Sequence, residues 1–422
     1  MEESKSTLNL LTFASKFHPQ TEAAIRNSHL AMFERLDKCY NVRVVMSNEL
    51  DDFLKDPDRV GQTFVFMATG GTENMVRQAY ELLPHPLALI TDGKANSLAA
   101  SMELACWARQ QGDECFICDE FTIRNSQFTM DYSQCAICNL QCANNDATLL
   151  KGERIGVIGK PSDWLISSDV DYDAARERWG VEYVDIPLSK VELYYNMCDD
   201  DVSSMTAKLL SEASGCEEPN EKDIAKAFRL YLALKKVVEE YRLTALTIQC
   251  FSLIPTTCTT GCLALALLND EGIVAGCEGD LQSIFTMLLA KRATGVDGFM
   301  ANPSSADKAA NRIVFAHCTI GLKQTCRYVM RSHFESGIGV AIQGILPEGE
   351  VTIVKCGGKS LDKSVILTGR IIDNQSDPNN CRTQILVDLD DSIDYFFNNN
   401  IGNHHIILQG SHKRELEAFF EV

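Results

Sequence analysis

The sequence has few basic residues relative to acidic ones, and this shortage limits the partners that the protein can bind. Its 422 residues contain 39 Lys and Arg against 58 Asp and Glu, which gives a formal net charge of −19 at pH 7. Binding to nucleic acid requires clustered Lys and Arg that neutralise phosphates, and anionic membrane surfaces make a similar demand. We therefore expect neither nucleic acid nor a membrane as a partner.

Long apolar runs and an export signal are also missing. No stretch of about 18 consecutive apolar residues is present, so the sequence predicts no transmembrane helix. The first residues, MEESKSTLNLLTF, carry two acids and no basic region before the apolar run, unlike a signal peptide. The 17 cysteines then favour a reducing compartment in which thiols stay free. We expect a cytoplasmic protein.

The remaining composition is that of a globular protein, with 45% hydrophobic and 23% charged residues. The length exceeds one ordinary core and suggests several domains. Residues 1–148 alternate apolar runs such as TLNLLTF and TFVFMATGG with segments of helical periodicity, and residues 149–298 repeat this texture. The alternation predicts two doubly wound, Rossmann-like α/β domains, which bind ligands at the carboxyl ends of their strands.

The sequence pattern changes in residues 299–422. Short β-type runs such as RIVFAHCTI, EVTIVKCGG and HHIILQG are separated by Gly, Pro, Asn and Asp, with few helical segments between them. This pattern predicts a C-terminal antiparallel β domain or barrel.

Three short motifs contain side chains that bind divalent metals. Glu278 lies in Gly-Cys-Glu-Gly-Asp after a predicted strand, His317 lies in Ala-His-Cys-Thr, and His405 ends Gly-Asn-His-His before the last strand. A carboxylate with imidazoles suits Mn²⁺ or a similar cation. Spacing alone leaves open whether they share one site, since His317 can be a structural histidine and Asp280 a helix N-cap.

These segments carry a resemblance to a known family. The runs GIVAGCEGDLQSIFTMLL, FAHCTIG and GNHHIILQGSHKRELEAFF, the Gly-Gly-Thr-Glu loop at 70–73 and the order of domains are similar to those of the fucose and arabinose isomerase superfamily. The resemblance covers most of the chain and is most specific in the C-terminal third. In length the chain is closer to the short fucose-isomerase-like proteins.

The resemblance implies a metal-dependent aldose–ketose isomerase that acts on a monosaccharide through a cis-enediol. It implies Mn²⁺ or another divalent cation held by Glu278, His317 and His405, with Glu278 also as acid or base. His404 would contact the sugar or relay a proton. A homo-oligomer, with sites completed by a neighbouring subunit, is implied as well.

The chain departs from the family at one position. The family has a second metal-binding carboxylate after a Phe-Met-like strand, where this chain reads Phe-Met-Ala301-Asn302. Asn302 can ligate through its amide oxygen but cannot act as a base, so Asp280 or Glu335 would have to substitute. The alternatives are a sugar-binding or regulatory relative, and an isomerase for an acid-bearing sugar such as a sulfo-sugar.

Further candidates for substrate contacts lie in loops after predicted strands. They are Thr72 and Glu73, Ser162 and Trp164, and His333 and Glu335, with Lys160, Arg292 and Arg327 as possible partners of an acidic group. These positions could also have purely structural roles. Thr72 could be the N-cap of a helix at a tight turn, and residues 331–336 could form a solvated loop.

The cysteines offer a rival motif. Cys115-x₂-Cys118, followed after sixteen residues by Cys135-x₂-Cys138, has the spacing of a four-thiolate zinc site, which would indicate a zinc-stabilised interaction protein. However, ECFICDE reads as a strand, which points Cys115 and Cys118 to opposite faces. The spacing of Cys135, Cys138 and Cys142 fits the buried face of a helix, so we favour core packing.

Overall fold

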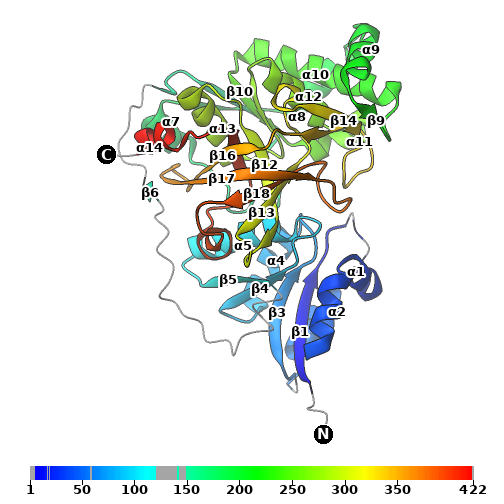
Figure 1. Ribbon diagram of the computed structural model, residues 1–422, viewed down its shortest axis with the longest axis vertical. Helices are drawn as coiled ribbons and strands as arrows, with labels where there is room; N and C mark the ends of the chain where they lie inside the picture. The colour runs from blue at the N-terminus through cyan, green and yellow to red at the C-terminus, as the bar shows by residue number, and fades with distance from the viewer. Residues whose placement is uncertain are drawn as a thin grey trace.

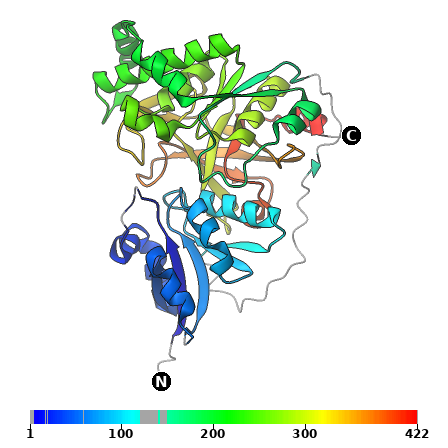
Figure 2. The same cartoon turned by 180° about the vertical axis from the view of Figure 1, so that it is seen from behind.

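The structure is a computed structural model that describes residues 5–119, 140–141 and 149–420, apart from 17, 19 and 58. Figure 1 shows three tiers along the long axis: an N-terminal α/β unit at the bottom, a β barrel in the middle and a second α/β unit at the top. Figure 2 shows the same order from behind. The barrel therefore joins the two α/β units.

The N-terminal unit is built on a five-stranded parallel sheet of order β2-β1-β3-β4-β5. Both faces of β1 are covered, because Leu8 and Leu10 join one core cluster and Leu11 and Phe13 another. The strand order reverses between β1 and β3. The strands are β1 (Ser6–Phe13), β2 (Tyr40–Met46), β3 (Gln62–Met67), β4 (Leu87–Thr91) and β5 (Cys115–Asp119), and the helices are α1 (Glu22–Ser28), α2 (Leu30–Cys39), α3 (Leu50–Lys55), α4 (Glu73–Ala79) and α5 (Ser97–Gln110).

The second unit contains a four-stranded parallel sheet of order β11-β10-β7-β8, which reverses between β7 and β10. Helix α10 begins in a capping box formed by Asn220 and Asp223. The strands are β7 (Arg154–Ile158), β8 (Glu182–Ile186), β10 (Ala245–Ile248) and β11 (Val274–Gly276), and the helices are α7 (Tyr172–Trp179), α8 (Leu188–Asn196), α9 (Ser203–Glu212), α10 (Glu221–Tyr241), η4 (Cys250–Leu253), α11 (Ile254–Thr257), α12 (Cys262–Asp270) and α13 (Leu281–Thr294).

The C-terminal part forms a closed antiparallel barrel of order β16-β19-β12-β13-β18-β17, in which β17 pairs back with β16. Closure leaves these strands without a free edge. Helix α5 packs on β12 from below and α13 packs on β16 from above (Figure 1). The strands are β12 (Phe299–Asp307), β13 (Arg312–His317), β16 (Gly349–Gly357), β17 (Lys363–Gln375), β18 (Thr383–Leu389) and β19 (His405–Gln409).

Smaller elements complete the described chain. Strand β6 (Leu140–Gln141) pairs with β17, and a three-stranded sheet of order β15-β14-β9 joins the second unit to the C-terminal part. These remaining elements are β9 (Gly215–Cys216), β14 (Arg327–Arg331), β15 (Ala341–Ile345), the π-helix η6 (Tyr395–Asn399), α14 (Lys413–Phe420) and the 3₁₀ turns η1 (Ser47–Glu49), η2 (Tyr80–Leu82) and η5 (Leu322–Gln324).

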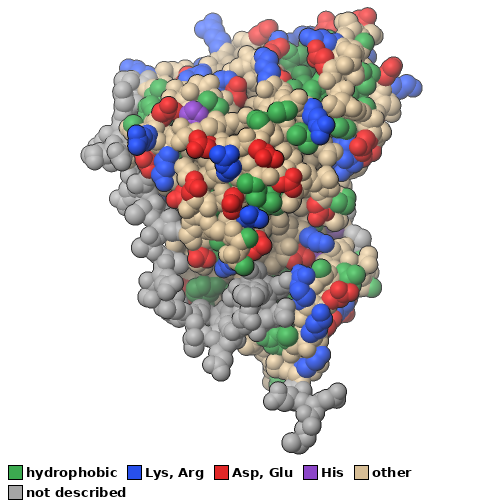
Figure 3. Space-filling model, in the orientation of Figure 1, with side chains coloured by type: hydrophobic (Ala, Val, Ile, Leu, Met, Phe, Trp, Pro, Cys, Tyr) green, Lys and Arg blue, Asp and Glu red, His purple; other side chains and the backbone are tan. Residues whose placement is uncertain are grey.

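The predicted fold class is confirmed: two doubly wound α/β units are followed by an antiparallel barrel. The division into domains 1–148, 149–298 and 299–422 stays a prediction. On the face in Figure 3, Lys and Arg side chains are interspersed with Asp and Glu. Within the described residues no single helix is long and apolar enough to cross a membrane, although the bent pair Cys250–Thr257 and Cys262–Asp270 passes by length and composition.

Candidate active site

A cavity of about 300 Å³ lies where the two α/β units meet the barrel. Its lining comes from loops that follow the carboxyl ends of parallel strands in both sheets. Ser15 follows β1 and Gly70 follows β3, while Trp164 follows β7 and Phe251 follows β10. Both pairs flank the points where strand order reverses, which is where such sheets bind ligands. The expectation of a site at the strand ends is consistent with this cavity.

Glu278 occupies the centre of this cavity wall. It follows β11 with a φ of 63°, a left-handed conformation that is uncommon outside glycine. Its Oε2 accepts a hydrogen bond from Trp164 Nε1 at 2.5 Å, and its Oε1 lies 3.6 Å from His404 Nε2 and 3.8 Å from His317 Nε2. Burial opposes ionisation, but the two imidazoles outweigh it and hold the pKa of Glu278 well below its usual range.

Asp280 fixes the orientation of His404. Its Oδ1 caps α13 by accepting from Ser283 N, while its Oδ2 lies 2.9 Å from His404 Nδ1 and 3.9 Å from Lys355 Nζ. The Asp280, His404 and Lys355 side chains are all fully buried. The interpretation of Asp280 as an N-cap is thus confirmed, and its second oxygen serves the site. Burial lowers the pKa of His404, but Glu278 and Asp280 raise it to about 9.

The residues present suit a divalent cation. Cys277, Glu278 and His317 each offer one ligand atom, and these atoms all lie within 4.8 Å of one another. His404 Nε2 is buried without a hydrogen-bond partner and faces Glu278. An orphaned imidazole nitrogen next to a carboxylate is a donor set that a borderline cation would satisfy.

His405 does not reach Glu278, although the resemblance implied it as a ligand. Its Nδ1 lies 2.7 Å from Asn403 O and its Nε2 lies 2.9 Å from Tyr395 Oη, so both ring nitrogens are engaged elsewhere. The ring packs among aromatic side chains, with Phe396 at 5.3 Å between centroids. Since neighbouring residues of an extended chain face opposite sides, the structure turns His404 toward Glu278 and His405 away from it.

Besides Glu278, the acidic residues that line the cavity are Glu73, Asp163 and Glu335, and two of them have raised pKa values. Burial and the charge of Glu278 raise the pKa of Glu335 to about 8, and Asn96 Nδ2 donates to Glu335 Oε1 at 3.4 Å. Burial likewise raises the pKa of Glu73 well above its usual range, and its Oε2 has no hydrogen-bond partner. Glu278 is thus strongly acidic while Glu335 and Glu73 are weakly acidic, a separation typical of acid–base sites.

A smaller recess opens behind Glu278. It shares Asn96, Phe251, Glu278 and Glu335 with the main cavity and is otherwise lined by Cys262, Cys277, His317, Cys318, His333 and Cys381. His333 packs its ring edge on Phe251 at 5.3 Å, and Ser336 N donates to its Nδ1 at 3.3 Å. His333 and Glu335 thus lie beside the cluster around Glu278.

Asn302 lines the main cavity from β12, as Asn403 does from the segment before β19. The backbone N–H of Asn403 donates to Glu103 Oε2 at 3.1 Å, and Glu103 is fully buried. Sequence reasoning missed Glu103, Lys355, Asn96 and Asn403. The only signal for Glu103 and Lys355 was a charged residue inside an otherwise apolar run.

Other predicted contacts lie outside the cavity lining. The Thr72 hydroxyl is buried and donates to Thr69 O at 2.8 Å rather than capping α4. Ser162 is buried as well, and its backbone N–H donates to Glu278 O at 2.9 Å. Both residues therefore support the loops of the site from behind.

The cations proposed for an acidic substrate group are engaged elsewhere or lie at the surface. Lys160 pairs with Asp163 at 3.0 Å, Arg292 pairs with Glu153 at 2.6 Å, and Arg327 is exposed on β14. Within the described part of the chain, Lys16 is the cation that lines the cavity. Sequence reasoning did not predict a role for Lys16.

The rival zinc motif is only partly visible. Cys115 and Cys118 lie on β5 in different core clusters, as the strand prediction required. Cys135, Cys138 and Cys142 lie outside the described residues.

Known proteins match part of the chain. It is 29% identical over 182 residues to the sulfoquinovose isomerase of Clostridium sp. (strain MSTE9). The matched segment covers 41% of this chain and 40% of that protein. This chain is similar to sulfoquinovose isomerases. Those of Priestia aryabhattai and Priestia megaterium are 24% identical over 142 residues, 32% of each chain. The match spans about two fifths or less of these relatives, and no protein-family model matches.

Proposed function

We propose that this protein is an aldose–ketose isomerase of the fucose and arabinose isomerase superfamily, acting on a monosaccharide through a cis-enediol intermediate. The observation that carries the proposal is the cavity at the strand ends that Glu278 and Glu335 both line, with His404 Nε2 3.6 Å from Glu278 Oε1. The partial similarity to sulfoquinovose isomerases supports the same reaction class.

Glu278, His317 and His404 would hold the divalent cation, with Mn²⁺ as the candidate from the resemblance. The orphaned Nε2 of His404 and its distance of 3.6 Å from Glu278 Oε1 support this assignment, in which His404 replaces His405. When bound, such a cation polarises the sugar carbonyl and stabilises the charge of the enediolate. Asp280 keeps Nε2 of His404 directed at Glu278 by holding Nδ1.

Glu335 is our candidate for the acid–base group that moves the proton between C1 and C2. It lines the same cavity as Glu278, and its pKa of about 8 lies near neutral pH, where one carboxyl can both accept and return a proton. Asn302 would position a sugar hydroxyl, and the Trp164 ring would cover the apolar face of the sugar.

This arrangement favours an enzyme over a sugar-binding relative. A binder that had lost the second carboxylate would need no second carboxyl beside Glu278 with a pKa suited to proton transfer. Glu335 and the buried Glu73 both line the cavity. An acid compensating for Asn302 is what turnover requires.

Two substrate classes, sulfonated and neutral sugars, are compatible with the cavity lining. The names of the similar proteins point to a sulfonated sugar, and Lys16 would be its cationic partner in this cavity. A neutral sugar would bind through the amides and the Trp164 ring alone. We retain the cytoplasm and a homo-oligomer as part of the proposal, the latter testable by native mass measurement.

The decisive experiment is a screen of neutral and sulfonated aldoses in D₂O with Mn²⁺, read by NMR for deuterium at C1 or C2. We expect exchange with at least one sugar, and its loss in E335Q while cation binding persists. Bound cation without exchange for any sugar would contradict the isomerase and favour the binder.

A further inference from the structure

We propose that Cys277 is a thiolate ligand of the cation at Glu278, which makes this a site selective for Zn²⁺ over Mn²⁺ and Mg²⁺. The inference rests on the cation site of the proposed function. It adds a donor that the resemblance does not supply and changes the expected metal.

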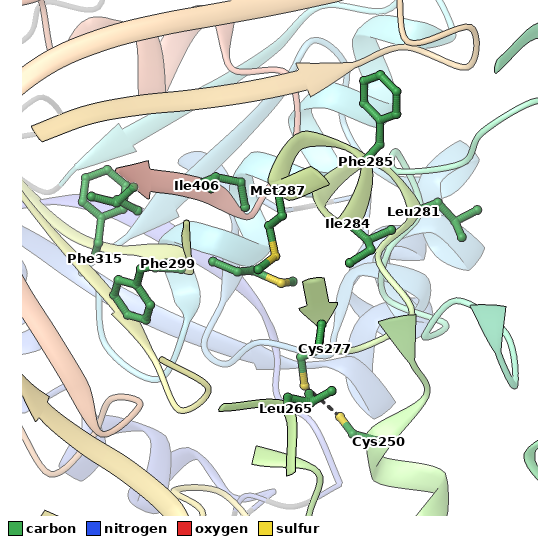
Figure 4. Close-up of a cluster of buried hydrophobic side chains, with 14 of the residues drawn as sticks. Cys250, Leu265, Cys277, Leu281, Ile284, Phe285, Met287, Phe299, Phe315 and Ile406 are labelled. Carbon is green, nitrogen blue, oxygen red and sulfur yellow. Dashed lines mark hydrogen bonds between the residues drawn. The ribbon is translucent and has the colours of Figure 1, made fainter. Parts of the chain in front are cut away.

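Cys277 lies close enough to Glu278 and His317 to share a cation with them. Cys277 follows β11 directly (Figure 4). It precedes Glu278 in the sequence, and its Sγ lies within 4.8 Å of the ligand atoms of Glu278 and His317. Consecutive residues of an extended strand point to opposite sides. Here the positive φ of Glu278 and of Gly279 bends the chain, so that both the thiol and the carboxylate reach one recess.

The Cys277 sulfur is buried next to a second thiol. Cys277 is 4% exposed and lines the recess behind the cavity together with Glu278 and His317. Figure 4 shows its Sγ directed to Cys250 of η4, with 3.1 Å between the sulfurs. The Cys250 S–H can donate to a Cys277 thiolate, and such outer-shell donors orient and stabilise metal ligands.

The donor set then decides the metal. Thiolates prefer soft and borderline cations such as Zn²⁺, whereas Mg²⁺ and Mn²⁺ favour sites built from oxygen. Catalytic zinc sites mix Cys, His and carboxylate ligands and keep a position for water or substrate. Cys277 would release its proton when the cation binds.

Cobalt substitution tests the assignment. One equivalent of Co²⁺ added to the metal-free, full-length protein should give visible d–d absorption and a near-ultraviolet sulfur-to-cobalt charge-transfer band. In C277S we expect the d–d absorption to remain and the charge-transfer band to disappear. C250S is the comparison variant: its serine hydroxyl can still donate to Cys277, but the sulfur 3.1 Å away is gone, so the band should persist if Cys277 is the ligand.

Competition between metals gives a second measurement. C277S should weaken Zn²⁺ binding by more than roughly tenfold and change Mn²⁺ binding far less. X-ray absorption on the zinc-loaded unmodified protein avoids reliance on a folded variant. It should show a sulfur neighbour at about 2.3 Å.

A shell of only nitrogen and oxygen around zinc would overturn the proposal, as would a charge-transfer band that survives in C277S or vanishes in C250S. These outcomes are separate from the fate of the proposed function. Sugar exchange with Mn²⁺ but no sulfur ligand would defeat this inference alone. A sulfur ligand without exchange for any sugar would defeat the isomerase and leave Cys277 as a ligand.

Discussion

Trp164 and Glu278 are joined by a hydrogen bond of 2.5 Å between the loops that follow β7 and β11. The indole donates to Oε2 and leaves Oε1 facing His317 and His404. Phe251 supports the indole from the loop after β10, with 5.3 Å between ring centroids. Three loops of one sheet thus determine how the Glu278 carboxylate is presented.

We predict that W164F weakens cation binding by roughly 10–100-fold, because it removes the outer-shell hydrogen bond and keeps an aromatic ring. Titration of the metal-free protein with Zn²⁺ and Mn²⁺ measures the change. W107F is a suitable control, since Trp107 packs on Tyr80 away from the cavity. Equal affinities for W164F and the unmodified protein would show that the bond does not orient Glu278.

Glu335 should make the metal-free protein less stable as pH rises. In the unfolded chain Glu335 loses its proton near pH 4.5, but in the folded protein only near pH 8. Between these values the folded state binds the extra proton, so the contribution of Glu335 to stability falls by up to ~1.4 kcal/mol per pH unit. Denaturant unfolding across this range should show that E335Q lacks this decline. If the free energy of unfolding changes with pH in the same way in both proteins, the Glu335 carboxyl is exposed to water.

Lys355 should be essential to stability although it is not part of the lining described for the main cavity. Its ammonium donates to Ser283 Oγ at 3.1 Å and lies 3.9 Å from Asp280 Oδ2, with no exposure of either charge. K355M leaves a buried carboxylate poorly compensated, and we expect a loss of about 3–5 kcal/mol. In D280N/K355M the loss should be smaller than the sum of the single losses. K359M, at an exposed lysine, is the control.

Lys16 distinguishes the two substrate classes. If the substrate is sulfonated, K16A should raise its KM about tenfold through loss of a charge-assisted contact, with kcat little changed. Turnover of a neutral sugar should be the same in both proteins. An unchanged KM for the sulfonated sugar would remove Lys16 from the site.

The fold was accessible from the sequence because periodicity encodes which faces are buried. The α/β alternation and the short C-terminal β runs predicted both parallel sheets and the barrel. It was harder to predict which of two adjacent histidines faces the site. His404 and His405 are adjacent, and only the pairing of β19 with β12 and β16 determines which imidazole faces Glu278.

Other parts of the site depend on contacts between distant segments. Glu335 lies in a loop after β14 without periodicity, and it meets Asn96 across 239 residues. Glu103 looked like an ordinary polar position of a helix, yet it accepts from Ser167 N and Asn403 N in the interior. No local pattern predicts such pairings, since they arise only when the three tiers pack together.

The left-handed backbone at Glu278 has a consequence for evolvability. A non-glycine residue in this conformation costs of order 1–3 kcal/mol, and its carboxylate is buried as well. Replacement by glycine would relax the backbone, but it would also remove the carboxylate that lies beside His317 and His404. A relaxed backbone and the proposed cation site therefore place opposite demands on this one position.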